Sequence, residues 1–133
     1  MKSVVVDTHA IIWYFKDQTK LSSAALLALD EASQACDPIY LPSISLVEMQ
    51  YLIEKGRIPQ QALDVLFAAL NLPNANLQIA PLDLKVAQAI EKISRDVVPD
   101  MPDRIIAATA FALGLPLVSR DRKIQAAAIH TIW

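Results

Sequence analysis

A run of three valines, Val4 to Val6, stops at Asp7, and a helix-compatible stretch from Thr8 to Lys16 follows directly. A β-branched run without polar alternation is typical of a strand that is buried on both faces. Such a strand needs helices on both sides of its sheet, and a sheet covered in this way is parallel or mostly parallel. The junction at Asp7 therefore favours an α/β fold.

Strand and helix patterns alternate along the rest of the sequence. We predict helices where apolar residues recur at helical spacing after a capping Ser, Asp or Pro, and strands where short apolar runs stand between turn residues. The further helices predicted are 22–35, 43 or 45 to 56, 60–71, one that begins at Asp83 and is ended by Pro99, 103–114 and a short one from 122. The predicted strands are 3–6, 38–41, 77–80, 117–119 and 129–132. No repeat or linker interrupts the pattern, so we predict a single domain over residues 1–133.

Composition excludes several other classes of protein. With 54% hydrophobic residues and a net charge of −2, the chain of 133 residues is too apolar to be disordered. The longest uncharged run, 105–118, is too short to cross a bilayer and contains Gly114 and Pro116. Cys36 is the only cysteine and cannot form an intramolecular disulfide. We therefore expect a cytoplasmic protein without a membrane segment.

Four acidic residues stand near the ends of predicted elements. Asp7 ends the first strand, Glu48 lies early in the helix after the second, Asp103 opens a later helix, and Asp121 follows the fourth strand. Ligands of open α/β sheets bind at the carboxyl ends of the strands, so we predict that these side chains converge there. Clustered carboxylates disfavour one another's charge unless a hard cation such as Mg²⁺ or Mn²⁺ joins them. The matching chemistry is metal-assisted hydrolysis of a phosphodiester.

Each of these acids also has a purely structural interpretation. Asp7 and Asp103 are suited to capping the helices that follow them. In the segment 45–48, Ser-Leu-Val-Glu fits a capping box, in which the Glu reaches back to the Ser backbone N–H. A helix that begins at Ser43 instead would place Glu48 in the second turn and direct it into the crevice. Asp121 also fits an exposed turn.

Four segments match, in order and interval, the successive motifs of one family. They are Val4-Val5-Val6-Asp7-Thr8-His9, Ser45-Leu46-Val47-Glu48, Asp103-Arg104-Ile105-Ile106-Ala107-Ala108-Thr109-Ala110 and Leu117-Val118-Ser119-Arg120-Asp121. Over nearly its whole length the chain resembles the PIN domain, and in particular the VapC-type toxins of bacterial type II toxin–antitoxin modules. The resemblance implies a three-layer α/β fold with a mostly parallel five-stranded sheet. It also implies a ribonuclease that uses Mg²⁺ or Mn²⁺ to cleave RNA, forms a homodimer and is inhibited by a VapB-type antitoxin.

The resemblance assigns roles to individual acids. Asp7, Glu48 and Asp103 match the family's central metal-binding acids, and Asp121 matches its fourth, more variable one. Asp100, three residues before Asp103, is an alternative to Asp121 as the fourth acid. On this basis we expect the four matched acids to bind the metal and to be catalytic.

Small polar residues accompany these acids. Thr8 and Ser119 match hydroxyl residues that orient carboxylates or water in the family. His9 occupies a position that varies among Asn, Ser and His. We expect His9 to be a satisfied polar residue at the pocket edge and do not assign it as a general base.

Basic and aromatic residues near the motifs are candidates for contact with RNA. The cations that flank two of the acids, and that we predict to contact the RNA backbone, are Arg104, Arg120, Arg122 and Lys123. Ordinary exposed ion pairs explain the same residues equally well. Trp13, Tyr14 and Phe15 are candidates for stacking on a base, although consecutive helical positions face different directions and at most two of them can face one groove.

Other functions and surfaces stay open from the sequence. The helices at 21–35 and 60–72 are candidates for a groove that accepts an antitoxin segment, and core packing is the competing interpretation. A phosphoaspartyl enzyme of the haloacid-dehalogenase kind would carry a second Asp at the position of His9. A non-catalytic PIN-like interaction module is the alternative to a nuclease that the sequence does not exclude.

Overall fold

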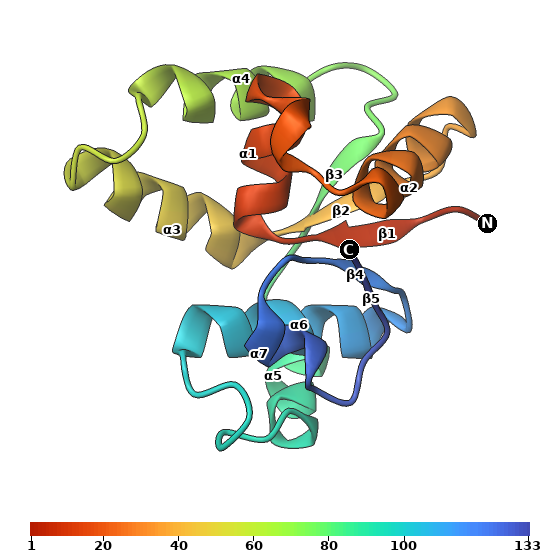
Figure 1. Cartoon of the computed structure of the whole chain (residues 1–133), viewed down its shortest axis with the longest axis vertical. Helices are drawn as coiled ribbons and strands as arrows, with labels where there is room; N and C mark the ends of the chain where they lie inside the picture. Colours follow the sequence, from red (N-terminus) through yellow and green to blue (C-terminus); the bar gives the residue numbers. More distant parts are fainter.

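Five short parallel strands form the centre of the computed structural model, which describes residues 1–133 (Figure 1). Their order in the sheet is β3-β2-β1-β4-β5, and every neighbouring pair is parallel. The strands are β1 (Val4–Val6), β2 (Ile39–Pro42), β3 (Leu77–Ala80), β4 (Leu117–Val118) and β5 (Thr131–Ile132). In the register, Val5 pairs with Tyr40 on one side and with Leu117 on the other. β1 is therefore the central strand.

Helices cover both faces of this sheet. Figure 1 shows one group of helices on one side of the sheet and a second group on the other. The first group is α1 (Thr8–Lys16), α2 (Ser23–Gln34), α3 (Ser43–Glu54) and α4 (Gln60–Leu70), and the second is α5 (Leu84–Ala89), α6 (Met101–Leu113) and α7 (Arg122–Gln125). Two short 3-10 helices, η1 (Gln18–Lys20) and η2 (Ile90–Lys92), complete the chain. No helix is long and apolar enough to cross a membrane.

The side chains of β1 alternate between two hydrophobic cores, as the pleat of a strand requires. Val4 and Val6 pack into the core formed with α1, α2, α3 and α4, whereas Val5 packs into the core formed with α5, α6 and α7. All three valines are buried. The double burial expected from the sequence is confirmed, and so is the α/β fold with its five-stranded parallel sheet.

Several predicted boundaries were wrong. α6 begins at Met101 and not at Asp103, because the side chain of Asp100 caps it and Pro102 fits its first turn. The helix predicted from Asp83 leaves the α-helical form after Ala89 and continues as η2. The last two strands are shorter than predicted, and η1 was missed. α3 begins at the earlier of its two candidate positions, Ser43, which decides the orientation of Glu48.

Candidate active site

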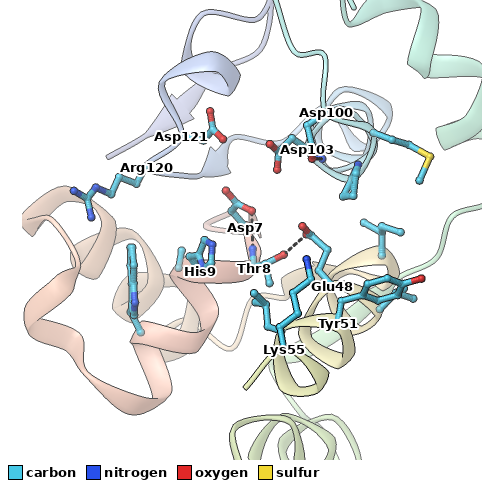
Figure 2. Close-up of a pocket in the computed structure, with 17 residues that line it drawn as sticks. Asp7, Thr8, His9, Glu48, Tyr51, Lys55, Asp100, Asp103, Arg120 and Asp121 are labelled. Atoms are coloured by element: carbon cyan, nitrogen blue, oxygen red, sulfur yellow. Dashed lines mark hydrogen bonds between the residues drawn. The ribbon is translucent and has the colours of Figure 1, made fainter. Parts of the chain in front are cut away.

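A cavity of about 780 Å³ opens where β1, β2 and β4 end (Figure 2). Its walls are the residues that follow these three strands and the first turn of α6. Five carboxylates line it, from Asp7, Glu48, Asp100, Asp103 and Asp121. The structure thus brings the four acids singled out in the sequence to one cavity and adds Asp100 to them.

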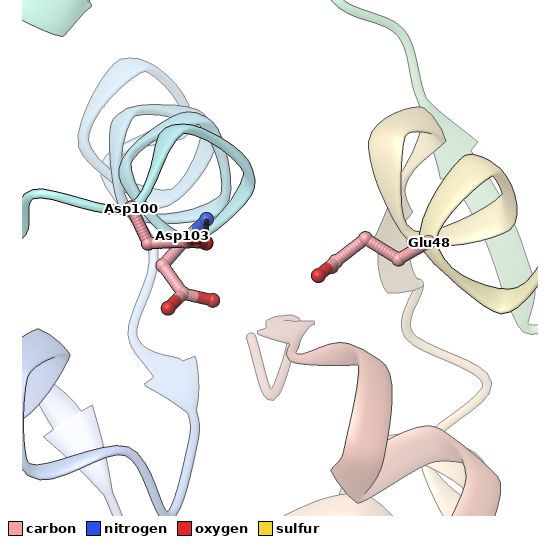
Figure 3. A group of neighbouring side chains, drawn as sticks. All are labelled: Glu48, Asp100 and Asp103. Carbon is pink, nitrogen blue, oxygen red and sulfur yellow. Dashed lines mark hydrogen bonds between the residues drawn. The ribbon is translucent and has the colours of Figure 1, made fainter. Parts of the chain in front are cut away.

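Glu48, Asp100 and Asp103 form the tightest group. One carboxylate oxygen from each lies within 4.8 Å of the others (Figure 3). Glu48 reaches the group from α3, while the two aspartates belong to the start of α6. Asp7 and Asp121 lie outside this group of three, whereas Asp100, the alternative to Asp121 in the sequence, belongs to it.

Asp7 caps a helix and lines the cavity at the same time. Its Oδ1 accepts a 2.7 Å hydrogen bond from the backbone N–H of Thr8, and its Oδ2 accepts one of 2.7 Å from the hydroxyl of Ser119. The oxygen of that hydroxyl in turn accepts a 3.1 Å bond from the N–H of Asp121. Burial raises the pKa of Asp7 above its usual value, and the two hydrogen bonds oppose that rise.

Glu48 is held by a short chain of hydroxyls. It lies in the second turn of α3, and no side chain caps that helix, so the alternative interpretation of 45–48 as a capping box does not hold. The hydroxyl of Thr8 lies 2.8 Å from both the Glu48 carboxylate and the buried hydroxyl of Ser45. An ionised carboxylate only accepts hydrogen bonds, so Thr8 donates to Glu48 and accepts from Ser45. Burial, with the charges of nearby acids, raises the pKa of Glu48.

Asp103 is the acid most affected by its neighbours. It stands in the first turn of α6 and donates its backbone N–H to Asp100 over 3.3 Å. Asp100 is therefore the helix cap, which was the alternative interpretation of Asp103. Burial and then the charges of the other four cavity acids raise the pKa of Asp103 to about 8. Without a cation, the Asp103 carboxyl is therefore mostly protonated at neutral pH.

Asp121 is more than part of an exposed turn. Its Oδ1 accepts hydrogen bonds from the N–H groups of Lys123 and Ile124, at 2.8 and 3.2 Å, and so caps α7. Its other oxygen remains available to the cavity. Capping and lining the site are compatible for this residue, as they are for Asp7.

The cluster fits a hard divalent cation. Its candidate ligands are all carboxylate oxygens, which Mg²⁺ and Mn²⁺ prefer over the nitrogen and sulfur donors typical of zinc sites. Burial is the first cause of the raised pKa of Asp103, and the charges of the other cavity acids add to it. A bound cation would favour the ionised form of each acid.

The predicted basic residues are divided between the cavity and the rest of the molecule. Only Arg120 lines the cavity. The guanidinium of Arg104 donates to the backbone carbonyls of Ile93 and Ile90, at 2.8 and 3.2 Å, and so ties α6 to η2. The remaining two, on α7, are exposed and lie outside the cavity lining.

Lys55, Tyr51 and Met101 line the cavity and were not singled out in the sequence. Lys55 follows Glu48 by two helical turns, and that spacing is the signal that could have found it. Tyr51 and Met101 line the cavity with large exposed side chains. Of the three consecutive aromatic residues on α1, only Trp13 lines the cavity.

The fold and the site together define an α/β protein with a cluster of acids at the carboxyl edge of its parallel sheet. The family model described as "PIN domain" matches residues 4–129. The chain belongs to the PIN domain family, which confirms the resemblance carried by the four motifs.

Individual relatives extend this assignment. The chain is 30% identical to Ribonuclease VapC22 of Mycobacterium tuberculosis (strain ATCC 25618 / H37Rv) over 94% of its own length and 92% of that protein. Its fold is similar to the structure of VapBC2 from Rickettsia felis bound to a promoter DNA fragment, with a TM-score of 0.72, 18% identity and coverage of 97% and 96% of the two chains. It is also similar to FitAcB from Neisseria gonorrhoeae, with a TM-score of 0.62, 19% identity and coverage of 96% and 95%.

The first prediction concerns the pH dependence of stability in a chelator. The pKa of Asp103 rises from 3.8 to about 8 on folding, so the folded state binds an extra proton between these values and loses stability as pH rises through them. Asp103→Asn removes this loss. At about pH 8 we expect the variant to be more stable by roughly 1 kcal/mol, or about 4 °C in Tm, after allowance for solvent screening at this half-buried side chain.

Thermal unfolding of both proteins across this pH range measures the difference, which should vanish at the acid end. Asp96→Asn, at an exposed position outside the cavity, is the matched control and should follow the wild type. A constant difference between Asp103→Asn and the wild type at every pH would contradict the prediction.

A second prediction tests the structural role of Arg104. Removing its guanidinium leaves the carbonyl of Ile93 without this donor, and the carbonyl of Ile90 with only the backbone N–H of Ile93. Arg104→Ala should therefore lower the free energy of unfolding by about 1–2 kcal/mol. Arg122→Ala, at an exposed position without such bonds, should change it by less than about 0.5 kcal/mol. Urea denaturation measures both values. Equal stability of the two variants would show that the hydrogen bonds of Arg104 to η2 do not stabilise the fold.

Proposed function

We propose that this protein is a divalent-metal-dependent endoribonuclease of the VapC type, which hydrolyses phosphodiester bonds in RNA. The observation that carries the proposal is the convergence of carboxylates from four separate segments on one cavity at the sheet edge. The family membership and the relative named as a ribonuclease support it.

The acids of the cavity would hold the cation. Glu48, Asp100 and Asp103 are the closest group, and Asp7 and Asp121 complete the acidic lining. Mg²⁺ and Mn²⁺ both suit such an oxygen-only set. When bound, the ion would stabilise charge on the phosphate and lower the pKa of an attacking water.

Other residues of the chain keep these carboxylates in position. The Ser45–Thr8 hydroxyl pair orients Glu48, and Ser119 fixes one oxygen of Asp7. Arg120 and Lys55, which reach the cavity from different elements, supply positive charge for phosphates on either side of the scissile bond. These two cations would thereby offset the negative charge of the RNA phosphates beside the acidic centre.

We further propose a VapB-type antitoxin as partner, a homodimeric assembly and a cytoplasmic location. The similarity of the fold to VapBC2 supports the choice of partner. A second cavity, of about 280 Å³, lies between α1 and α4 and is lined by the half-exposed side chains of Phe15 and Val65. This is consistent with the groove proposed along the helix at 60–72.

The decisive experiment is RNA cleavage by purified protein with Mg²⁺, with Mn²⁺ and in chelator. We expect cleavage only with a divalent cation, and a loss of about a hundredfold or more in Asp7→Asn and Asp103→Asn, because removing a ligand weakens charge stabilisation by several kcal/mol. Asp96→Asn should retain full activity. The thermal stability of each variant shows whether it is folded.

The outcomes separate the two functional classes. Equal cleavage by the wild type and both site variants would place the activity at a different site or in a contaminant. A folded wild type that cleaves no RNA with either cation would favour the non-catalytic interaction module instead.

A further prediction concerns the hydroxyl chain. Thr8→Val removes the donor to Glu48 without changing the side-chain shape, so we expect kcat to fall about tenfold with little change in KM for RNA. Thr8→Ser keeps the hydroxyl and should retain most of the activity. A rate in Thr8→Val equal to that of the wild type would show that Glu48 needs no such support.

A further inference from the structure

Three side chains stack on one another beside the acids, where α1 meets the segment after β4. The imidazole of His9 is nearly parallel to the indole of Trp13, with ring centroids 5.8 Å apart and 20° between the planes. The guanidinium carbon of Arg120 lies 5.8 Å from the centroid of the Trp13 ring. His9, Trp13 and Arg120, referred to below as the stack, all line the cavity that holds the acids. Figure 2 shows His9 and Arg120 beside Asp7 and Asp121.

The backbone fixes the stack relative to the acids. His9 follows Asp7 by two residues at the start of α1. Arg120 stands between Asp121 and Ser119, whose hydroxyl bonds the carboxylate of Asp7. Any group held on the stack is therefore held next to the acidic centre.

The guanidinium of Arg120 forms no ion pair within the protein. The only side-chain ion pair within 4.0 Å joins Lys2 and Glu31, at 3.4 Å, so Arg120 pairs with none of the cavity acids. Its exposed guanidinium lies over Trp13 instead. A stacked but unpaired guanidinium keeps both its hydrogen-bond donors and its planar surface for a ligand.

Tyr51 is the other aromatic residue exposed in the cavity, on the opposite wall formed by α3. It is 61% exposed, and no other ring packs against it, whereas Trp13 packs against both His9 and Trp133. Trp133 lies 6.0 Å from Trp13, centroid to centroid, and tilted by 58°. The stack is thus pre-organised, and Tyr51 is not.

Nucleobases bind such surfaces. A base stacks on aromatic rings and on the plane of an Arg guanidinium, largely independently of its identity. Inside a duplex, neighbouring base pairs already cover both faces of each base, so only an unpaired base can reach a protein stack. We propose that His9, Trp13 and Arg120 form a subsite for an unpaired nucleobase of the RNA whose phosphate lies at the acids. This rests on the proposed ribonuclease function and makes single-stranded RNA its substrate.

The test measures binding to short RNA in the Asp103→Asn background with Mg²⁺, where cleavage is not expected. Its probes are a single-stranded oligonucleotide, the same oligonucleotide with one abasic nucleotide, and the matching duplex. We expect the abasic change and the substitutions Trp13→Ala and Arg120→Lys each to weaken binding about tenfold, with no further loss when they are combined. Arg120→Lys keeps the charge and removes the planar surface, and Phe111→Ala, an exposed aromatic residue outside the cavity, is the matched control.

Intrinsic fluorescence gives a second readout, because the chain has only two tryptophans and both belong to this cluster. Single-stranded RNA should quench their emission, and the duplex should not. The comparison of intact with abasic RNA needs no substitution in the stack, so it remains informative even if Trp13→Ala unfolds.

Several results would overturn the proposal. They are equal affinity for intact and abasic RNA, or equal affinity for single-stranded and duplex RNA. A loss of RNA binding in a further variant, Tyr51→Ala, but not in Trp13→Ala or Arg120→Lys would also contradict it. So would quenching of the tryptophan emission by an added Arg-bearing peptide but not by RNA. The last would make the stack a protein-binding site. If the wild type binds intact RNA more tightly than abasic RNA but cleaves none, the base subsite stands and the proposed ribonuclease function is wrong. If it cleaves RNA but binds intact and abasic RNA equally, the ribonuclease function stands and the base subsite is wrong.

Discussion

Repulsion among carboxylates in one cavity is the constraint on which the rest of this structure depends. The fold gathers the acids because parallel strands all end at the same edge, and each acid directly follows a strand there or lies at the start or in the first two turns of a helix. Hydrogen bonds that Ser119, Thr8 and backbone N–H groups donate to the carboxylates partly offset this repulsion. It supplies no ion pair, so the charge is left for a cation to neutralise.

Much of the architecture could be predicted because it depends on local patterns. The valine run of β1 and the Asp7 that ends it give the central strand, its double burial and one cavity acid. The position of Glu48 depended on one boundary, the start of α3, which the sequence left between two serines. Asp100 was harder to place, because the prolines that flank it obscure where α6 begins.

Features that depend on tertiary contacts could not be predicted. Arg104 directly follows the cavity acid Asp103 in the sequence, and on that basis it was predicted to contact RNA. In the structure it instead donates to backbone carbonyls that the packing of η2 against α6 brings to it. The stacking of Arg120 on Trp13 joins residues far apart in the sequence. The high pKa of Asp103 arises first from burial, which no local motif encodes.

The Ser119–Asp7 hydrogen bond spans 112 positions of sequence and requires β4 to be paired with β1. During synthesis, domains fold only as their segments leave the ribosome, from the N-terminus onward. An emerging chain that ends before β4 lacks both this bond and Asp121, although it already carries Asp7 and Glu48. The full set of cavity acids therefore assembles only after β4 and Asp121 have been synthesised and β4 has paired with β1.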